Sequence, residues 1–214
     1  MKGLKVVKVL IACCMAAALG GGEVQAQYDF CAAAPSGQML YYRMVPERAQ
    51  VMVTHPEREW PYYAGNKPVG DLVIPDRVRH EGVDYEVVGV GENAFYRCDS
   101  LTGLTAKGIV TIGTQALCGC TALRTLALAE GLREIGEGAF AYCRGLTELV
   151  LPATVTHIGI SAFSMCEGLE EVRMTVATEG QCDAMTYYGC RLMQERKNRK
   201  IASVGGVEYA VWKL

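Results

Sequence analysis

The chain has 214 residues, a formal net charge of -2 and 21% charged residues. Its hydrophobic content is 50%, so it can bury a sizeable core. The near-neutral balance argues against a nucleic-acid-binding protein that depends on a basic surface, and against a disordered charged tail.

Residues 1–26 have the order of a secretory signal peptide. Lysines open the segment, a short apolar run follows, and Val24-Gln25-Ala26 supplies a small-x-small cleavage site. The apolar run is shorter than the roughly 20 residues that a membrane-spanning helix needs. We therefore expect cleavage after Ala26 and export by signal peptide, with the mature chain secreted or at the cell surface and carrying no transmembrane segment.

A lipid anchor is the alternative for this leader. Leu10-Ile11-Ala12-Cys13 resembles a bacterial lipobox, which would place a lipid on Cys13. Against that reading, the apolar run continues beyond the cysteine.

Residues 27–69 are expected to form an N-terminal β cap. The runs QMLYYRMV and AQVMVTH favour strands and are joined by Pro46-Glu47-Arg48, which predicts a hairpin. A loop bounded by Pro and Gly then follows, and its aromatic residues are Trp60, Tyr62 and Tyr63. Loops on rigid scaffolds often carry function, so these three are candidate binding residues. Packing of the cap against the rest of the chain is the alternative.

Residues 70–175 carry an internal repeat with a period of 22 or 23 residues. Each unit reads G-x-x-A-[FL]-x-x-C-x-x-L-x-x-[LV]-x-[ALM]. The four units begin at Gly91, Gly113, Gly136 and Gly159. A half-unit, LVIP at Leu72–Pro75, precedes them, followed by the insert RVRHEGVDYE, which predicts a hairpin turning at Glu81-Gly82.

Stacking would let the units bury what one unit alone leaves exposed. Alternate leucines of a strand point to one face, and neighbouring units can cover that face. We expect two columns of buried residues on the strands: Leu101, Leu123, Leu146 and Leu169; Leu104, Leu126, Leu149 and Val172. A third column is expected on a short helical turn: Phe95, Leu117, Phe140 and Phe163. The repeat glycines are expected where the backbone needs a positive φ.

The phrase A-F-x-x-C-x-x-L-x-x-[LV]-x-[LI]-P-x-x-V-x-x-I-G resembles the BspA-type leucine-rich repeat family of exported bacterial proteins. The resemblance covers about residues 70–175. It implies an α/β repeat solenoid, a right-handed leucine-rich-repeat horseshoe with short helical turns, which we expect to carry β-hairpin caps. It also implies an association with adhesion and protein binding at the cell surface. The chain departs from the pattern where Leu117 replaces phenylalanine, and only Pro75 and Pro152 keep the repeat proline.

Residues 176–214 are expected to form a C-terminal cap. We expect a short helix near residues 182–195, then the hairpin KIASVGGVEYAV with its turn at Gly205-Gly206. Cys182 and Cys190 lie outside the repeat pattern, and a disulfide between them is a candidate staple. Cys31 could pair with either, because connectivity does not follow from sequence.

The repeated cysteines raise the question of a metal or redox site. They are Cys98, Cys120, Cys143 and Cys166, one in each unit. A zinc ion needs four ligands that converge, whereas a linear ladder does not converge, so buried thiols are the expectation. The three histidines belong to no recognised catalytic motif. We therefore expect a non-catalytic protein with no cofactor and no metal.

The outward side chains of the strands are the other candidate binding surface. They are small and mixed, and Arg173 is the lone candidate anchor, with Glu148 and Glu171 near it. The expected partner is a protein or glycoprotein at a cell surface or in extracellular matrix, and not nucleic acid. The alternative is a structural cell-envelope component that self-associates without a soluble ligand.

Overall fold

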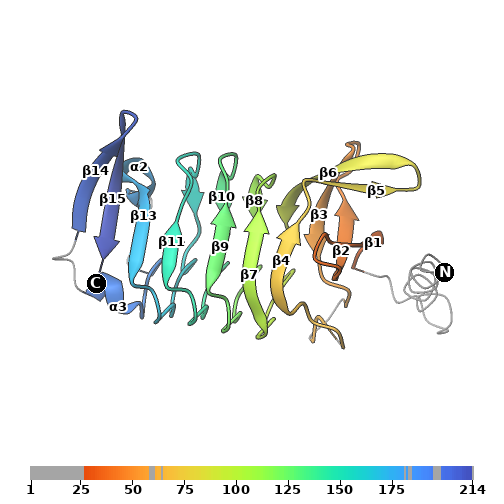
Figure 1. Ribbon diagram of the computed structural model, residues 1–214, viewed down its shortest axis with the longest axis horizontal. Helices are drawn as coiled ribbons and strands as arrows, with labels where there is room; N and C mark the ends of the chain where they lie inside the picture. Colours follow the sequence, from red (N-terminus) through yellow and green to blue (C-terminus); the bar gives the residue numbers. More distant parts are fainter. Residues whose placement is uncertain are drawn as a thin grey trace.

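The computed structural model describes residues 27–57, 61–63, 65–180, 182, 185–194 and 199–213. The expected signal peptide, the lipobox cysteine Cys13 and the loop residue Trp60 lie outside these ranges. The described chain is mostly strand, with two short helices, and its strands follow one another along the long axis of the molecule (Figure 1). They form three sheets: β1-β2-β3-β6-β8-β10-β12 with β5 paired to β6, then β11-β13-β15-β14, and β4-β7-β9.

The N-terminal strands are β1 (Phe30–Ala33), β2 (Met39–Met44) and β3 (Gln50–Thr54). β2 and β3 pair antiparallel, which confirms the predicted hairpin. β3 then pairs in parallel with β6 (Val83–Val90). Repeat glycines donate their N–H to a carbonyl of the preceding strand at 2.7 Å, in the pairs Gly91 to Val53, Gly113 to Val90, Gly136 to Ile112 and Gly159 to Ile135. β3 therefore takes the place of a repeat strand at the N-terminal end.

The insert after the half-unit is a hairpin of β5 (Arg77–His80) and β6, as predicted. It turns at Glu81 and Gly82, whose φ angles are 48° and 84°. Positive φ at both central residues is the condition for a tight type I′ turn. At the end of β5, His80 stacks on Phe30 of β1 with ring centroids 4.1 Å apart, so the hairpin is packed against the N-terminal strands.

Each repeat supplies a long strand and a short one. The long strands are β4 (Gly70–Ile74), β7 (Leu101–Ala106), β9 (Thr125–Leu128), β11 (Glu148–Val150) and β13 (Glu171–Thr175). The short strands are β8 (Thr111–Ile112), β10 (Glu134–Ile135) and β12 (His157–Ile158). Leu104 pairs with Leu72 on one side and Leu126 on the other, and Leu149 pairs with Val172. The pairing register predicted from the repeat is confirmed. We call the outward side of the long strands the strand face.

The phenylalanine positions lie in hydrogen-bonded turns, where short helical turns were predicted. Two positions in each turn have positive φ. The first is filled by Asn93, Gln115, Gly138 and Ser161, and the second by Arg97, Gly119, Tyr142 and Met165. A left-handed residue interrupts a right-handed helix, so each turn closes before a helix can form.

The repeat glycines allow close stacking, and the positive φ expected of them falls two residues later. A Cβ on Gly136 would lie 2.6 Å from the backbone nitrogen of Thr114. One on Gly113 would lie 2.8 Å from the backbone nitrogen of Glu92. Only glycine therefore lets one unit approach the next so closely.

The core contains the phenylalanine column and the cysteine ladder. Phe140 and Phe163 are fully buried and stack with ring centroids 5.3 Å apart. Three of the four ladder thiols donate to the carbonyl of the phenylalanine-column residue in the preceding unit: Cys120 to Phe95 (3.1 Å), Cys143 to Leu117 (3.3 Å), Cys166 to Phe140 (3.1 Å). The ladder is therefore a set of buried, hydrogen-bonded thiols.

The C-terminal residues add a further turn to this core. Tyr187 stacks on Phe163 at 5.3 Å, and Cys190 donates its S–H to the Phe163 carbonyl at 3.0 Å. Cys190 thus extends the ladder, although the sequence alignment placed it outside the repeat.

Helix and hairpin surround this last turn. The helices are α2 (Val176–Glu179) and α3 (Arg191–Gln194), and α3 lies in the range where a helix was expected. β14 (Arg199–Val204) and β15 (Val207–Lys213) form the predicted hairpin with Gly205 and Gly206 in its turn. β15 pairs antiparallel with β13, so the hairpin continues the sheet of the long strands.

Candidate binding surfaces

The candidate residues Glu148, Glu171 and Arg173 lie together on the strand face. Parallel pairing of β11 with β13 sets Glu148 beside Glu171 and Val150 beside Arg173. The Glu171 carboxylate accepts from Lys213 Nζ at 2.9 Å and from Arg173 Nη2 at 3.1 Å. Lys213 first, and then Arg173, hold the pKa of Glu171 below its ordinary value. Lys213 reaches this cluster from β15, and sequence reasoning did not single it out.

A groove of about 900 Å³ lies on the strand face between β9 and the C-terminal hairpin. It lies where the sheet β4-β7-β9 meets the sheet β11-β13-β15-β14. Its apolar lining includes Ala127, Val150, Pro152, Ala202, Val204 and Val211. We call it the strand-face groove.

Incomplete burial of two repeat leucines makes this groove apolar. The aligned leucines of neighbouring units are buried: Leu104, Leu149 and Leu151. Leu126 and Leu128 of β9 are only half-buried, and both line the groove. Val150 is 40% exposed and Val204 is 66% exposed. The groove therefore presents part of the repeat core together with aliphatic side chains of the hairpin.

Charged side chains also line the groove. Arg173, Lys200 and Glu130 are among its residues. Glu130 accepts from the backbone N–H groups of Ala153 (3.1 Å) and Thr154 (3.2 Å), so its carboxylate is fixed in place.

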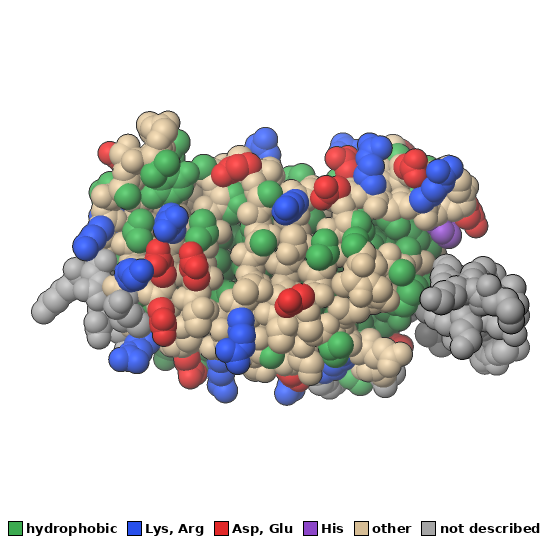
Figure 2. Space-filling view, in the orientation of Figure 1, with side chains coloured by type: hydrophobic (Ala, Val, Ile, Leu, Met, Phe, Trp, Pro, Cys, Tyr) green, Lys and Arg blue, Asp and Glu red, His purple; other side chains and the backbone are tan. Residues whose placement is uncertain are grey.

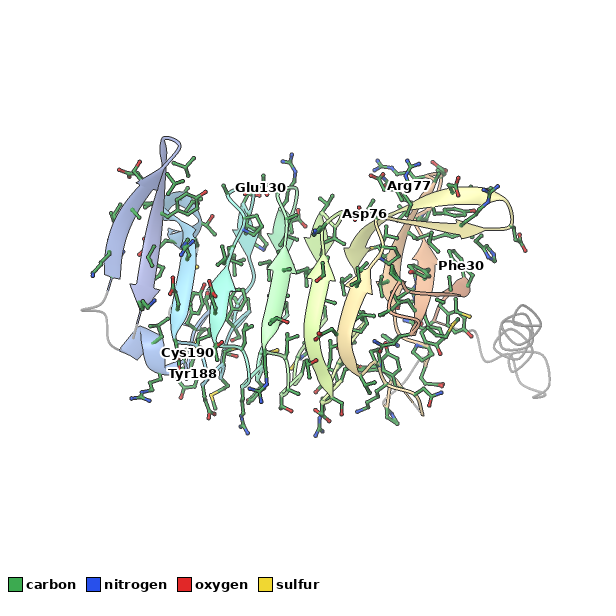
Figure 3. The ribbon with its side chains drawn as sticks, in the orientation of Figure 1. Phe30, Asp76, Arg77, Glu130, Tyr188 and Cys190 are labelled. Carbon is green, nitrogen blue, oxygen red and sulfur yellow. The ribbon has the colours of Figure 1, made fainter. Side chains whose placement is uncertain are left out.

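Hydrophobic side chains gather over the upper part of the C-terminal strands, with acidic side chains below them (Figure 2). Glu130 lies near the upper end of β9 (Figure 3).

The two described aromatic residues of the N-terminal loop have different environments. Tyr63 is 6% exposed, and its hydroxyl donates to the Ala94 carbonyl at 2.6 Å. Tyr63 therefore packs against the first repeat turn, as the alternative for this loop proposed. Tyr62 is half-buried, with ring centroids 4.4 Å from His55 and 5.7 Å from Tyr96. It lines a smaller pocket of about 310 Å³.

Cys182 and Cys190, the candidate disulfide partners, have different surroundings in the structure. Cys190 donates its S–H to the Phe163 carbonyl. Cys182 Sγ lies 3.6 Å from the Thr178 carbonyl and 3.9 Å from the sulfur of Met174. A disulfide between Cys182 and Cys190 therefore stays a prediction.

Burial keeps three of the ladder thiols, Cys98, Cys120 and Cys143, protonated. It raises the pKa of Cys98 to about 12 and raises the pKa of Cys120 and Cys143 as well. The thiolate is the form that binds metals and attacks substrates, so these thiols are unsuited to either role. Within the ranges that the structure describes, no cluster of three His, Cys, Asp or Glu side chains could hold a metal ion. None of the helices in those ranges is long and apolar enough to cross a bilayer.

Comparison with known proteins connects this geometry to a family. Residues 86–204, more than half of the chain, match six copies of the BspA type leucine rich repeat region. The matched range extends past residue 175 and includes the last turn with Cys190. No curated protein matches the chain.

Solved structures of leucine-rich repeat proteins are similar to the chain. One from Bacteroides capillosus has 25% identity and a TM-score of 0.50, with 63% of this chain and 93% of that chain covered. The pneumococcal vaccine antigen PcpA has 22% identity and a TM-score of 0.51, with 71% and 39% covered. One from Bacteroides ovatus has 27% identity and a TM-score of 0.45, and this chain spans 41% of its length and is itself 68% covered. The first two comparisons show a leucine-rich repeat fold.

Proposed function

The chain belongs to the BspA type leucine-rich repeat family, and we propose that it is an exported, non-catalytic protein-binding module that acts at a cell surface. The strand-face groove carries this proposal, because it exposes leucines that the repeat otherwise buries. The leader-like residues 1–26 support export. We further propose that the units wind as a right-handed α/β solenoid whose strand face is the concave side.

Rigid surface complementarity is the proposed mechanism. The partner would be a protein or glycoprotein of a cell surface or of extracellular matrix, and would insert an apolar segment into the strand-face groove. Arg173 is held by Glu171, and Glu130 is held by backbone donors, so neither side chain needs to be ordered on binding. Such preorganisation lowers the entropic cost of association.

Two valines of one repeat position provide a matched test. Val150 (40% exposed) lines the groove, whereas Val73 (37% exposed) lies at the same position of β4, outside the groove's lining. Purified matrix and surface proteins would be passed one at a time over the immobilised chain and over Val150→Glu and Val73→Glu variants. We expect Val150→Glu to weaken saturable binding at least about tenfold and Val73→Glu to leave it unchanged.

The controls separate this site from the N-terminal loop. Both variants should keep the melting temperature of the unmodified chain, because both valines are exposed. Equal binding by Val150→Glu and Val73→Glu would remove the strand-face groove as the site. Loss of binding in Tyr62→Ala alone would move the site to the N-terminal loop.

One observation favours self-association as a second function. All six residues of the edge strand β14 are exposed. In a hairpin with a two-residue turn, Val204, Ala202 and Lys200 direct their backbone groups toward β15. Ser203 and Ile201 then present theirs to the open edge, where a second copy of β14 could pair antiparallel. With Ile201 opposite its own copy, Lys200 would face Ala202, so like charges would not oppose each other.

Proline substitution tests this alternative. Ile201→Pro removes an N–H that points to the open edge and leaves the pairing of β14 with β15 intact. We expect it to abolish dimers in sedimentation equilibrium with little change in melting temperature. Ala202→Pro, the control, should instead destabilise the hairpin. A chain that is monomeric at every concentration tested would exclude self-association through β14.

A further inference from the structure

The smaller pocket, of about 310 Å³, lies at the N-terminal end between the end of β3 and the first repeat turn. Its residues include Arg43, His55, Tyr62, Glu92 and Asn93. It shares no lining residue with the strand-face groove, so what it binds is independent of the function proposed for that groove.

Asn93 lines this pocket, and its side chain has a buried hydrogen-bond acceptor without a partner among the described residues. Its side chain is 7% exposed, and Nδ2 donates to Glu92 Oε1 at 3.4 Å. Its Oδ1 is buried and has no hydrogen-bond partner among the described residues. Buried polar atoms are nearly always paired, so a donor that the described residues do not supply is expected here.

The repeat itself does not require this amide. Asn93 has a φ of 55°, which asparagine tolerates, and this conformation explains the residue type. Gly138 and Ser161 fill the same position in later units with φ of 58° and 57°. The orphaned oxygen is therefore a feature of this pocket and not of the repeat.

The remaining polar groups define what could enter. His55 is 3% exposed, and its Nδ1 is hydrogen-bonded to the Glu57 carbonyl, so Nδ1 carries the proton. Burial lowers the pKa of His55, which leaves a neutral ring with Nε2 as its acceptor. The pocket lining also contains the positive guanidinium of Arg43 and the negative carboxylate of Glu92, and these two charges cancel.

We propose that this pocket binds one neutral sugar ring, a hexose unit of a glycan. Hydroxyl groups would donate to Asn93 Oδ1 and to the Glu92 carboxylate and would accept from Arg43. The C–H face of the ring would lie against the aromatic ring of Tyr62. Arg43 and Glu92 together give the pocket no excess charge that would favour a cation or an anion, while an apolar ligand would leave Asn93 Oδ1 unpaired.

A matched pair of variants tests the pocket. Asn93→Gly removes the unpaired acceptor at a position where Gly138 shows that glycine fits. Gln115→Gly makes the same kind of change at the same position of the next unit (φ 51°), whose residues do not line the pocket. The full chain from an exporting host would be titrated with glucose, galactose, mannose and N-acetylglucosamine by ligand-observed NMR, and passed over the same sugars immobilised.

We expect at least one of these sugars to bind, about tenfold more weakly to Asn93→Gly and unchanged to Gln115→Gly. Without sugar, Asn93→Gly should melt no lower than the unmodified chain, because it loses an unpaired buried group. If no sugar binds, free or immobilised, the donor to Asn93 is water and the proposal fails. Equal binding by the two variants would overturn it as well.

Discussion

The two ends of the repeat stack cover their open apolar faces differently. At the N-terminal end, β3 supplies the backbone edge of a repeat strand, and Tyr63 covers the first turn and hydrogen-bonds to Ala94. At the C-terminal end, residues 185–190 copy the repeat turn, with Tyr187 stacked on Phe163 and Cys190 extending the ladder. Residues outside the repeat therefore cover the N-terminal end, whereas a further repeat-like turn covers the C-terminal end.

The difference determines what each end exposes. Residues outside the repeat cover the N-terminal end, and the two buried side-chain atoms that lack a partner in the described ranges lie in this cover (Tyr42 Oη) and in the first repeat turn beside it (Asn93 Oδ1). The pocket at this end is polar. The C-terminal end keeps the apolar columns, and its hairpin leaves the strand-face groove beside the half-buried Leu126. The candidate surfaces therefore lie where the chain departs from the repeat.

The largest expected loss of stability comes from truncating Tyr187, which adds a further stacked ring to the phenylalanine column at the C-terminal end. Tyr187 is 5% exposed and stacks on Phe163 at 5.3 Å. Tyr187→Ala should lower the free energy of unfolding by about 3–5 kcal/mol, the range for truncating a buried aromatic residue. Urea unfolding followed by circular dichroism measures it. A loss below about 1 kcal/mol would mean that the last turn does not cover the stack.

The next largest effect on stability distinguishes the hydroxyl group of Tyr63, at the N-terminal end, from that of Tyr187, at the C-terminal end. Tyr63→Phe leaves the Ala94 carbonyl without its 2.6 Å donor and should cost about 1–3 kcal/mol. Tyr187→Phe should cost less than about 1 kcal/mol, because the partners of its hydroxyl among the described residues are the weakly accepting sulfurs of Met174, at 3.9 Å, and Cys182. Paired urea denaturation curves give both values. Equal losses of stability in the two variants would contradict the view that the two ends of the stack are covered in different ways.

The sequence predicted the repeat well because the same stacking contacts recur in every unit. Cys190 was missed because TYYGC keeps only the aromatic residue and the cysteine three positions later, without the glycine and alanine that mark the other units. Leu126 aligns with Leu104, but its exposure depends on where the sheet of long strands divides. No local pattern encodes that division.

The candidate sites were predicted less completely, for a related reason. Arg173 and Glu171 follow from the alternation of one strand, and the structure places them side by side. Lys213 joins them only because β15 pairs with β13. The pocket around Asn93 is lined by residues that are distant in sequence, so the unpaired Oδ1 becomes apparent only in the folded chain.

The smallest expected effect on stability concerns two carboxylates of the strand face, Glu171 near the C-terminal end and Asp71 near the N-terminal end. Lys213 and Arg173 lower the pKa of Glu171, so the folded value lies below the unfolded value of about 4.3. A lowered carboxyl pKa stabilises the fold above the unfolded value, and the contribution is lost as pH falls through the folded value. Glu171→Gln should therefore cost less than about 1 kcal/mol at pH 7, as for an exposed ion pair, and progressively less below about pH 4.3.

Added salt should distinguish the ion cluster around Glu171 from the carboxylate of Asp71, which lies on β4 at the same outward repeat position. Asp71 Oδ1 accepts from the neutral hydroxyl of Thr102 at 2.8 Å. Added salt screens exposed charges, so it should shrink the effect of Glu171→Gln and leave that of Asp71→Asn nearly unchanged. Thermal melts of the unmodified chain and both variants, at low and high salt and from pH 7 to pH 3, provide the measurement. A salt-independent Glu171→Gln effect would mean that Glu171 acts through packing, since an ion pair at this exposed end must respond to screening.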